Sequence, residues 1–274
     1  MILIEDIDGV RKFRLARSIL GRGLYYTAAY WIDGLMTDTG CAYTVSELVS
    51  ALEGSYVDLI VNTHSHEDHI GANGALQRRF GAKIMAHPSA LPVLAEPRKR
   101  QRLKPYQLVM WGYPDASNGT AIGATVETSN HRFKVIHTPG HSPDHICLYE
   151  PDRGWLFSGD TYIGGRDQAL RADYNIWEII RSLRKLANLE VTFLFTASGS
   201  VRGNARRDLV EKIRYLEETG ERVLELHRQG LSYGRIRRKL FGREQAIAYF
   251  TLGHFSGKHL VRSFVEDRAS QGGK

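Results

Sequence analysis

The stretch THSHEDH occupies residues 63–69 and holds three imidazoles and two carboxylates within six consecutive positions. It follows a mainly apolar run at residues 57–61, which predicts a buried strand that leads into the cluster. Neutral imidazole is a common metal ligand, and carboxylates balance the charge of a bound cation. Without a cation, so many ionisable groups beside a buried strand would be costly. The stretch therefore predicts a metal site rather than a surface run of histidines.

Length and composition are those of an ordinary globular protein. The 274 residues, 42% of them hydrophobic, suffice for one large domain with a small appendage. No apolar run reaches about 18 residues and residues 1–6 lack the start of a secretory signal, so we expect no membrane contact. Cys41 and Cys147 lie in or beside apolar segments, as is typical of reduced thiols. We therefore expect a cytoplasmic protein.

Six candidate ligands follow the carboxyl ends of predicted strands. Loops at one edge of a sheet can converge on a point, while the strands hold them rigidly. Three histidines and a water form the open geometry of catalytic zinc, and a shared carboxylate suits a two-metal hydrolytic centre. The candidates are His64, His66, Asp68, His69, His141 and Asp160.

Four short motifs resemble, in the same order, the signature motifs of the metallo-β-lactamase fold superfamily. They are TDTG at residues 37–40, HSHEDH at 64–69, TPGH at 138–141 and GD at 159–160. The resemblance implies an α/β fold, a four-layer αββα sandwich with the metals at one edge of its two sheets. A small helical C-terminal extension, as in some hydrolases of this superfamily, is also implied.

The resemblance covers roughly residues 15–216. It implies a metallo-β-lactamase-like catalytic domain at residues 1–216 and a basic helical subdomain at residues 217–274. The first two histidines of HSHEDH and His141 would hold one metal, while Asp68 and His69 would hold a second. Asp160 would bridge the two metals.

The implied activity is hydrolysis of an ester-, thioester- or lactone-like small molecule by a metal-bound hydroxide. One or two zinc ions are the expected cofactor, and Asp68 would orient the attacking water. An antibiotic-degrading role is not expected, because such enzymes are normally exported.

One departure concerns the second metal. The family usually supplies a histidine there, from a Pro-Gly-His-Gly turn after a late strand, whereas this chain reads ASGS at residues 197–200. We interpret Ser200 as the replacement, and a hydroxyl is a poorer zinc ligand than imidazole. The second metal would then bind weakly, the centre would hold one metal, or the metal would be iron or manganese. A mononuclear non-haem iron enzyme similar to persulfide dioxygenases of this superfamily is therefore the alternative.

Other polar side chains near these motifs are candidates for supporting the ligands or contacting the substrate. For Tyr162 we favour packing over donation to an oxyanion. Arg202 either pairs with an anionic substrate or is an ordinary surface residue. Histidines that flank a ligand loop either orient the ligands or simply have their hydrogen bonds satisfied at the edge of the sheet. The full set is Asp38, His87, His137, His145, Tyr162, Ser200 and Arg202.

The net charge of +7 comes entirely from the C-terminal part of the chain. Residues 1–200 hold 21 basic and 21 acidic residues, whereas residues 201–274 hold 16 and 9. We favour a solvated, salt-bridged helical surface. A nucleic-acid processing or binding protein that uses this basic tail is a further alternative, although no motif diagnostic of RNA binding is present. A homodimer formed through the tail is another hypothesis.

Two expectations concern regular structure outside the motifs. Residues 95–131 contain several prolines and polar residues, which predicts a long irregular insertion that acts as a lid or binding loop. An apolar stripe of Leu209, Ile213 and Leu216 predicts a helix that Gly220 breaks.

Overall fold

The structure is a computed structural model that describes residues 1–269. The chain divides into two compact units, which are described separately. The first comprises Met1–His137, Pro143–Ile163 and Val191–Asn204. The second comprises Thr138–Ser142, Gly164–Glu190 and the chain from Ala205 onward. Across the described residues, none of the helices combines the length and the apolar character needed to cross a membrane.

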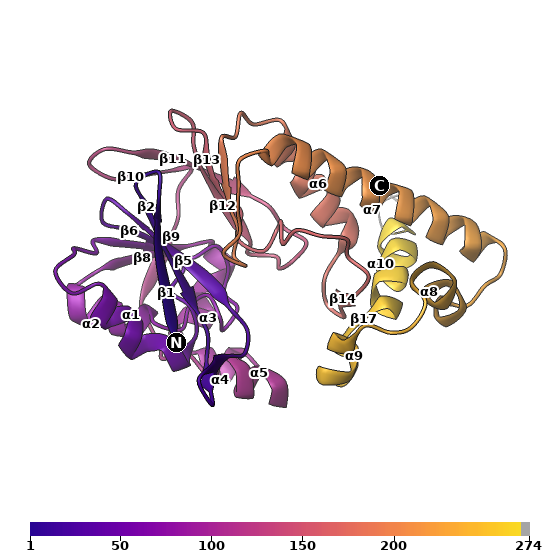
Figure 1. Cartoon of the computed structure of the whole chain (residues 1–274), viewed down its shortest axis with the longest axis horizontal. Helices are drawn as coiled ribbons and strands as arrows, with labels where there is room; N and C mark the ends of the chain where they lie inside the picture. The colour runs from indigo at the N-terminus through magenta and orange to yellow at the C-terminus, as the bar shows by residue number, and fades with distance from the viewer. Residues whose placement is uncertain (270–274) are drawn as a thin grey trace. The chain divides into compact units, whose positions relative to one another are not determined.

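Seven strands of the first unit form one mixed sheet, in the order β1-β2-β5-β6-β7-β8-β9 (Figure 1). Pairing is antiparallel from β1 to β6 and parallel from β6 to β9. The turn Asp33-Gly34 joins β5 to β6, with positive φ at both residues, as a tight hairpin turn requires. The strands are β1 (Ile2–Ile7), β2 (Val10–Leu15), β5 (Thr27–Ile32), β6 (Leu35–Thr37), β7 (Leu59–Val61), β8 (Lys83–Ala86) and β9 (Gly119–Ala121).

Six further strands form the second sheet of this unit, in the order β10-β11-β12-β13-β15-β16. Only the pairing of β13 with β15 is parallel. A separate small hairpin, β3 (Ser18–Ile19) with β4 (Arg22–Gly23), precedes β5. The second-sheet strands are β10 (Thr125–Glu127), β11 (Arg132–His137), β12 (Ile146–Glu150), β13 (Trp155–Phe157), β15 (Phe193–Phe195) and β16 (Val201–Arg202).

One apolar core joins the two sheets, and another joins the first sheet to helices. Tyr30 and Val61 of the first sheet share a buried cluster with Phe133 and Phe195 of the second. The opposite face of the first sheet buries its side chains against α1, α2 and α3. Burial of both faces explains why the short strand β7 is apolar throughout and why β6 is apolar except for Thr37. These helices are α1 (Val45–Ala51), α2 (Asn73–Phe80) and α3 (Leu91–Ala95), with short helices η1 (Ala42–Thr44) and η2 (Pro88–Ala90).

The insertion is more regular than the sequence predicted. Residues 95–131 contain α4 (Pro97–Arg100), α5 (Pro105–Met110) and the edge strands β9 and β10. Two of the prolines that suggested an irregular segment, Pro97 and Pro105, each begin a helix instead. Proline is favoured at the first helical position, where its missing N–H would have no partner in any case.

The second unit is mainly helical. Its two-stranded sheet pairs β14 (Leu170–Arg171) with β17 (Phe255–Ser256). The α/β class with two sheets, flanking helices and C-terminal helices is confirmed. The predicted domain boundary after residue 216 falls inside α7, and it stays a prediction. The helices are α6 (Ile176–Ala187), α7 (Ala205–Arg228), α8 (Tyr233–Phe241), α9 (Ala246–Phe250) and α10 (Gly257–Ala269).

The prediction that Gly220 breaks the tail helix was wrong, because α7 continues through it. A Cβ atom at this position would lie 2.8 Å from the ring of Phe264 on α10. Glycine is therefore present so that α7 and α10 can approach closely, and close packing outweighs the low helix propensity of glycine.

Candidate metal centre

The candidate site begins at the carboxyl edge of the parallel strands of the first sheet. Asp38 follows β6, His64 lies three residues after β7, and His87 follows β8. Because β6, β7 and β8 run parallel, their carboxyl ends meet at the same edge. Two backbone hydrogen bonds extend this ladder beyond the strands, from Asp38 N to Val61 O (3.0 Å) and from Asn62 N to Met85 O (3.1 Å). The edge therefore holds the polar loops rigidly.

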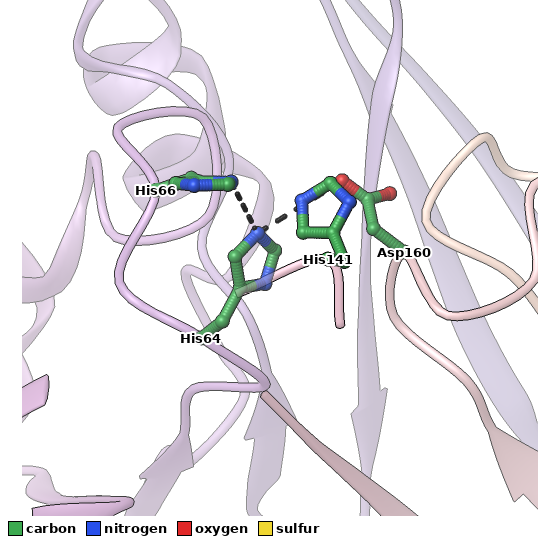
Figure 2. Close-up of side chains that lie close together, drawn as sticks. All are labelled: His64, His66, His141 and Asp160. Carbon is green, nitrogen blue, oxygen red and sulfur yellow. Dashed lines mark hydrogen bonds and ion pairs between the residues drawn. The ribbon is translucent and has the colours of Figure 1, made fainter. Parts of the chain in front are cut away.

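Four side chains suited to metal binding lie close together and point toward one another (Figure 2). One is buried and three are half-buried, and each offers one ligand atom. These atoms all lie within 4.8 Å of one another. Three imidazoles and one carboxylate are the donor types of a divalent transition metal such as zinc. The four are His64, His66, His141 and Asp160.

Asp38 organises two of the histidines. Its carboxylate accepts hydrogen bonds from the Thr63 backbone N–H (2.7 Å), the Thr63 hydroxyl (2.7 Å) and His69 Nδ1 (2.8 Å). Because the Thr63 hydroxyl gives its proton to Asp38, it can only accept from His64 Nδ1, at 3.0 Å. Asp38 thus holds both imidazoles with Nδ1 protonated, which in the neutral rings leaves the Nε2 lone pairs for a metal.

His69 supplies the clearest sign that a cation belongs here. Its Nε2 atom is buried and has no hydrogen-bond partner within the described part of the chain. Carboxylate oxygens of Asp160 and Asp68 lie 3.5 Å and 3.7 Å from this atom, too far for well-made hydrogen bonds. Buried polar atoms without partners are rare in native proteins. A metal ion is the ligand that can satisfy an imidazole nitrogen and two carboxylates at once.

Electrostatics lead to the same conclusion. Burial alone would lower the pKa of His69, but the three carboxylates around it raise that pKa well above 6.5. Burial raises the pKa of Asp68 above 3.8, and Asp160 raises it further, although His69 opposes this. Even if His69 takes up a proton, its single positive charge does not balance the three carboxylates around it. The residues present fit a divalent cation.

His145 holds Asp160 in place through the backbone. The backbone N–H of Asp160 donates to His145 Nε2 at 3.0 Å, and His145 Nδ1 lies 3.1 Å from the Thr161 hydroxyl. Gly159 makes room for this imidazole, because a Cβ there would lie 2.6 Å from His145 Nε2. His145 is completely buried and acts by placing the carboxylate.

Two other predicted histidines form a separate pair. The rings of His87 and His137 stack, with centroids 4.7 Å apart and an angle of 12° between their planes. Burial lowers the pKa of His87, and the neighbouring His137 lowers it further, against a raising effect from Asp144. The carboxylate of Asp144 also accepts a hydrogen bond from the backbone N–H of Ser65, between two candidate ligands (2.9 Å). The pair therefore lies beside the ligand loop.

The positions of the remaining candidates say less about a role at the site. Tyr162 is buried, in keeping with a packing role, and Arg202 is exposed on β16. The Ser200 hydroxyl lies 2.9 Å from Thr196 Oγ1 and 3.3 Å from Ser198 Oγ. Its loop is joined to the Asp160 loop by a hydrogen bond from Ala197 N to Gly159 O (3.1 Å). Ser200 thus belongs to a group of three hydroxyls.

Three further residues at the site escaped sequence reasoning. The Thr27 hydroxyl donates to Asp68 Oδ2 at 3.1 Å, and Gln107 Nε2 donates to Glu67 Oε1 at 2.7 Å. In the second unit, the Tyr174 hydroxyl lies 3.2 Å from His141 Nε2, with ring centroids 4.3 Å apart. No local motif marks Thr27, Gln107 or Tyr174, because each is far in sequence from its partner.

The basic tail forms ion pairs of its own. Arg237 pairs with Glu244 at 3.3 Å and Arg228 with Glu225 at 2.7 Å. Ile236 of α8 is completely buried, so this helix has a core face as well as a basic one. These contacts support the salt-bridged interpretation, and nucleic-acid binding stays a hypothesis.

Comparison with known proteins shows which family this chain resembles in sequence. A family model described as "Metallo-beta-lactamase superfamily" matches residues 22–198. A hydroxyacylglutathione hydrolase of Maricaulis maris is 34% identical over 109 residues, 39% of this chain and 35% of that protein. A beta-lactamase-like protein 2 homolog of Caenorhabditis elegans is 28% identical over 200 residues, 70% of this chain and 60% of that protein. Each alignment thus spans less than two thirds of the relative.

Solved structures agree on the fold. The crystal structure of a metallo-beta-lactamase family protein from Thermus thermophilus superposes with a TM-score of 0.67 at 21% sequence identity. The superposition covers 97% of this chain and 95% of that one, so it includes the C-terminal helices. Because the family model matches well over half of the sequence and the fold agrees, this chain belongs to the metallo-beta-lactamase superfamily.

Proposed function

We propose that this protein is a metal-dependent hydrolase of an ester-, thioester- or lactone-like small molecule. The observation that carries the proposal is the unpartnered His69 Nε2, which faces two carboxylates beside a cluster of three further imidazoles. Several relatives are named hydroxyacylglutathione hydrolase, which makes a hydroxyacyl thioester of glutathione the first substrate to test.

In this proposal, His64, His66 and His141 hold one metal and Asp160 contributes a carboxylate to it. Asp68 and His69 offer ligands for a second metal. A bound divalent metal supplies a hydroxide nucleophile at neutral pH and polarises the acyl carbonyl. Superfamily membership and the His/Asp cluster support a divalent metal, and we propose zinc.

The chain's own residues position the reactants. Asp38 orients two imidazoles, and His145 places the Asp160 carboxylate through its backbone N–H. Asp68, held by the Thr27 hydroxyl, orients the attacking water and accepts a proton from it. The hydroxyl of that water ends on the acyl carbon, the carbon–sulfur or carbon–oxygen bond breaks, and the departing thiol or alcohol leaves with a proton.

The position of Ser200 supports a second candidate. Its hydroxyl is engaged with Thr196 and Ser198, and a hydroxyl would bind a second metal more weakly than the histidine usual in the superfamily. A single iron ion with oxygenase activity on a persulfide is therefore the alternative to zinc hydrolysis. The burial of the Cys41 and Cys147 thiols agrees with the cytoplasmic location that we propose.

The test begins with elemental analysis of protein purified without added metal. We expect zinc, and hydrolysis of thioesters by the zinc-loaded protein, followed through the released thiol. His66→Ala should lose metal and activity together, whereas His227→Ala, an exposed histidine of α7, should retain both. Zinc without hydrolysis of any ester, thioester or lactone would contradict the proposal. One iron per chain with oxygen uptake on glutathione persulfide would replace it with the oxygenase.

A further inference from the structure

Two hydrogen bonds tie separate segments to the metal-binding loop. Asp68 accepts from the Thr27 hydroxyl (3.1 Å) at the start of β5. Its neighbour Glu67 accepts from Gln107 Nε2 (2.7 Å) on α5, and both of these side chains are buried. A buried carboxylate that loses its donor is strongly destabilised, so these ties are firm. The start of β5 and the insertion are therefore anchored side by side at one loop.

These ties bring together two aromatic residues. Tyr25 lies two residues before Thr27, and Trp111 lies four residues after Gln107. Their rings meet edge to face, with centroids 5.6 Å apart and an angle of 85° between the planes. The Trp111 backbone is also fixed, because its carbonyl accepts from Ala42 N at 3.1 Å. Tyr25 and Trp111 thus form a fixed pair, here called the aromatic wall.

The wall lies near the carboxylates of the metal centre and is open to solvent. Tyr25 keeps 52% of its surface exposed. Burial raises the pKa of this phenol, and Asp160 and Asp68 raise it further, so both carboxylates are within electrostatic reach. An accessible aromatic surface beside the candidate ligands is suited to contact the substrate.

Trp111 offers a second sign of a ligand. Its indole Nε1 is buried and has no hydrogen-bond partner among residues 1–269. Tryptophan N–H groups usually find a partner when buried. A polar atom of a bound molecule, or a water that comes with it, would satisfy this donor.

We propose that the aromatic wall of Tyr25 and Trp111 is the specificity surface of the enzyme and packs against an uncharged apolar or aromatic acyl group. The inference rests on the proposed hydrolase function and names the substrate class. Tyr25 and Trp111 present aromatic ring surface and no charged group, so an apolar or aromatic acyl group fits this surface better than an ionic one. The nearby residues Leu24 and Val109 are also partly exposed, at 39% and 47%, which extends the apolar character.

The first test compares benzoyl and acetyl thioesters of the same thiol, using metal-loaded protein. Tyr25→Ala should lower the benzoyl-to-acetyl ratio of kcat/KM by roughly 10-fold, and Trp111→Ala by at least as much. Tyr25→Phe should keep the ratio, because the ring and not the hydroxyl makes the contact. The matched control is Tyr56→Ala, since Tyr56 is also half exposed and meets Trp31 edge to face at 5.9 Å.

A ratio that stays at the wild-type value in Tyr25→Ala, or falls equally in Tyr56→Ala, would overturn the proposal. If Trp111→Ala does not fold, the Tyr25 variants decide alone. A binding experiment tests this proposal independently of the hydrolase assignment. Phenylacetate should bind the metal-loaded wild-type protein more tightly than acetate by calorimetry, and Tyr25→Ala should lose that preference even if no thioester is cleaved. Equal affinity for the two acids in the wild-type protein would also reject the wall.

Discussion

Two groups of buried charge in this protein are balanced in different ways. In the second unit, Asp167 lies 2.8 Å from Lys212 Nζ, which also donates to the carbonyl oxygens of Gly164 and Gly165 at 3.0 Å each. That group is complete with residues of the chain alone. In the first unit, three carboxylates surround one imidazole whose Nε2 has no hydrogen-bond partner among the described residues. This difference indicates that an excess of buried charge of one sign, rather than burial itself, is the feature that points to a ligand site.

The two groups should also differ in what they do for stability. The Lys212 group fixes the segment before β14 onto α7 and contributes to folding. The carboxylates of the candidate metal centre should repel one another in the absence of a bound cation and so reduce the stability of the metal-free protein. Binding sites commonly sacrifice stability in this way. Substitutions in the two groups should therefore have opposite consequences.

The largest expected effect is that of Asp160→Asn. We expect metal affinity to fall by more than about 100-fold, because loss of a proposed ligand should cost more than the roughly 10- to 100-fold typical of a residue that only supports ligands. The metal-free variant should meanwhile be more stable than the metal-free wild type, by about 1 kcal/mol, because Asp68 loses a like-charged neighbour. Chelator competition measures the affinity, and urea unfolding measures the stability.

The matched change in the second unit is Asp167→Asn. It should leave metal affinity unchanged and lower stability, because Lys212 loses its carboxylate. A metal-free Asp160→Asn protein that is destabilised as much as Asp167→Asn would show that both groups are structural, and the comparison would fail.

Next in size is the effect of Lys212→Met. We expect a loss of about 3 kcal/mol in the free energy of unfolding at pH 7, the low end for breaking a buried pair, because Asp167 keeps 17% of its side-chain surface exposed. Burial already raises the pKa of Asp167 above 3.8, and the loss of Lys212, which lowers it, will raise it further. A folded-state pKa above the unfolded one favours the folded protein at low pH and loses that contribution as pH rises. The destabilisation should therefore be smaller at pH 4 than at pH 8.

Urea unfolding at both pH values measures this effect. Lys258→Met, an exposed lysine of α10, is the control and should change little. The double variant Lys212→Met/Asp167→Leu should recover part of the lost stability, since it leaves no unpaired charge. A double variant less stable than Lys212→Met would show that the pair is not the cause.

The candidate metal cluster could be predicted from sequence because its candidate ligands are concentrated in short motifs. HSHEDH supplies His64 and His66 within three residues, and the strand before it is apolar enough to be recognised. The supporting residues were not predictable in the same way. Asp144 is 79 residues from Ser65 and Thr27 is 41 residues from Asp68, so only the folded sheets bring them together.

Parts of the fold were also missed or misread. Strands β1 and β2 escaped prediction, because β1 exposes Leu3 and Ile4 and lacks a clear alternation of buried and exposed positions. Gly220 and the two helix-initiating prolines were read as breakers, although each has a position-specific reason to be in a helix. Propensity alone could not show what surrounds these residues.

A smaller effect is expected from Asp38→Asn, which tests how the metal centre is held. Asp38 accepts from Thr63 twice and from His69, and an amide offers only one oxygen for these donors. We expect metal affinity to fall about 10- to 100-fold, with the ligands themselves intact. Asp33→Asn is the control, because Asp33 (φ 47°) shares the positive φ of Asp38 (φ 59°) but lies at the β5–β6 turn. Equal metal affinity in Asp38→Asn and wild type would show that Asp38 does not control the imidazoles.

The smallest expected effect concerns the pKa of His87, which its surroundings lower instead of raise. Burial lowers the pKa of His87 below 6.5, and the stacked His137 lowers it further. A lowered folded-state pKa contributes stability above the unfolded pKa, and that contribution is lost as pH falls through the folded value. His137→Gln should raise the pKa of His87 by less than about one unit, since burial remains, and should make unfolding less sensitive to acid. NMR titration of the His87 ring protons measures the shift. A lower pKa of His87 in the variant would show that His137 stabilises the charged form of His87, contrary to this prediction.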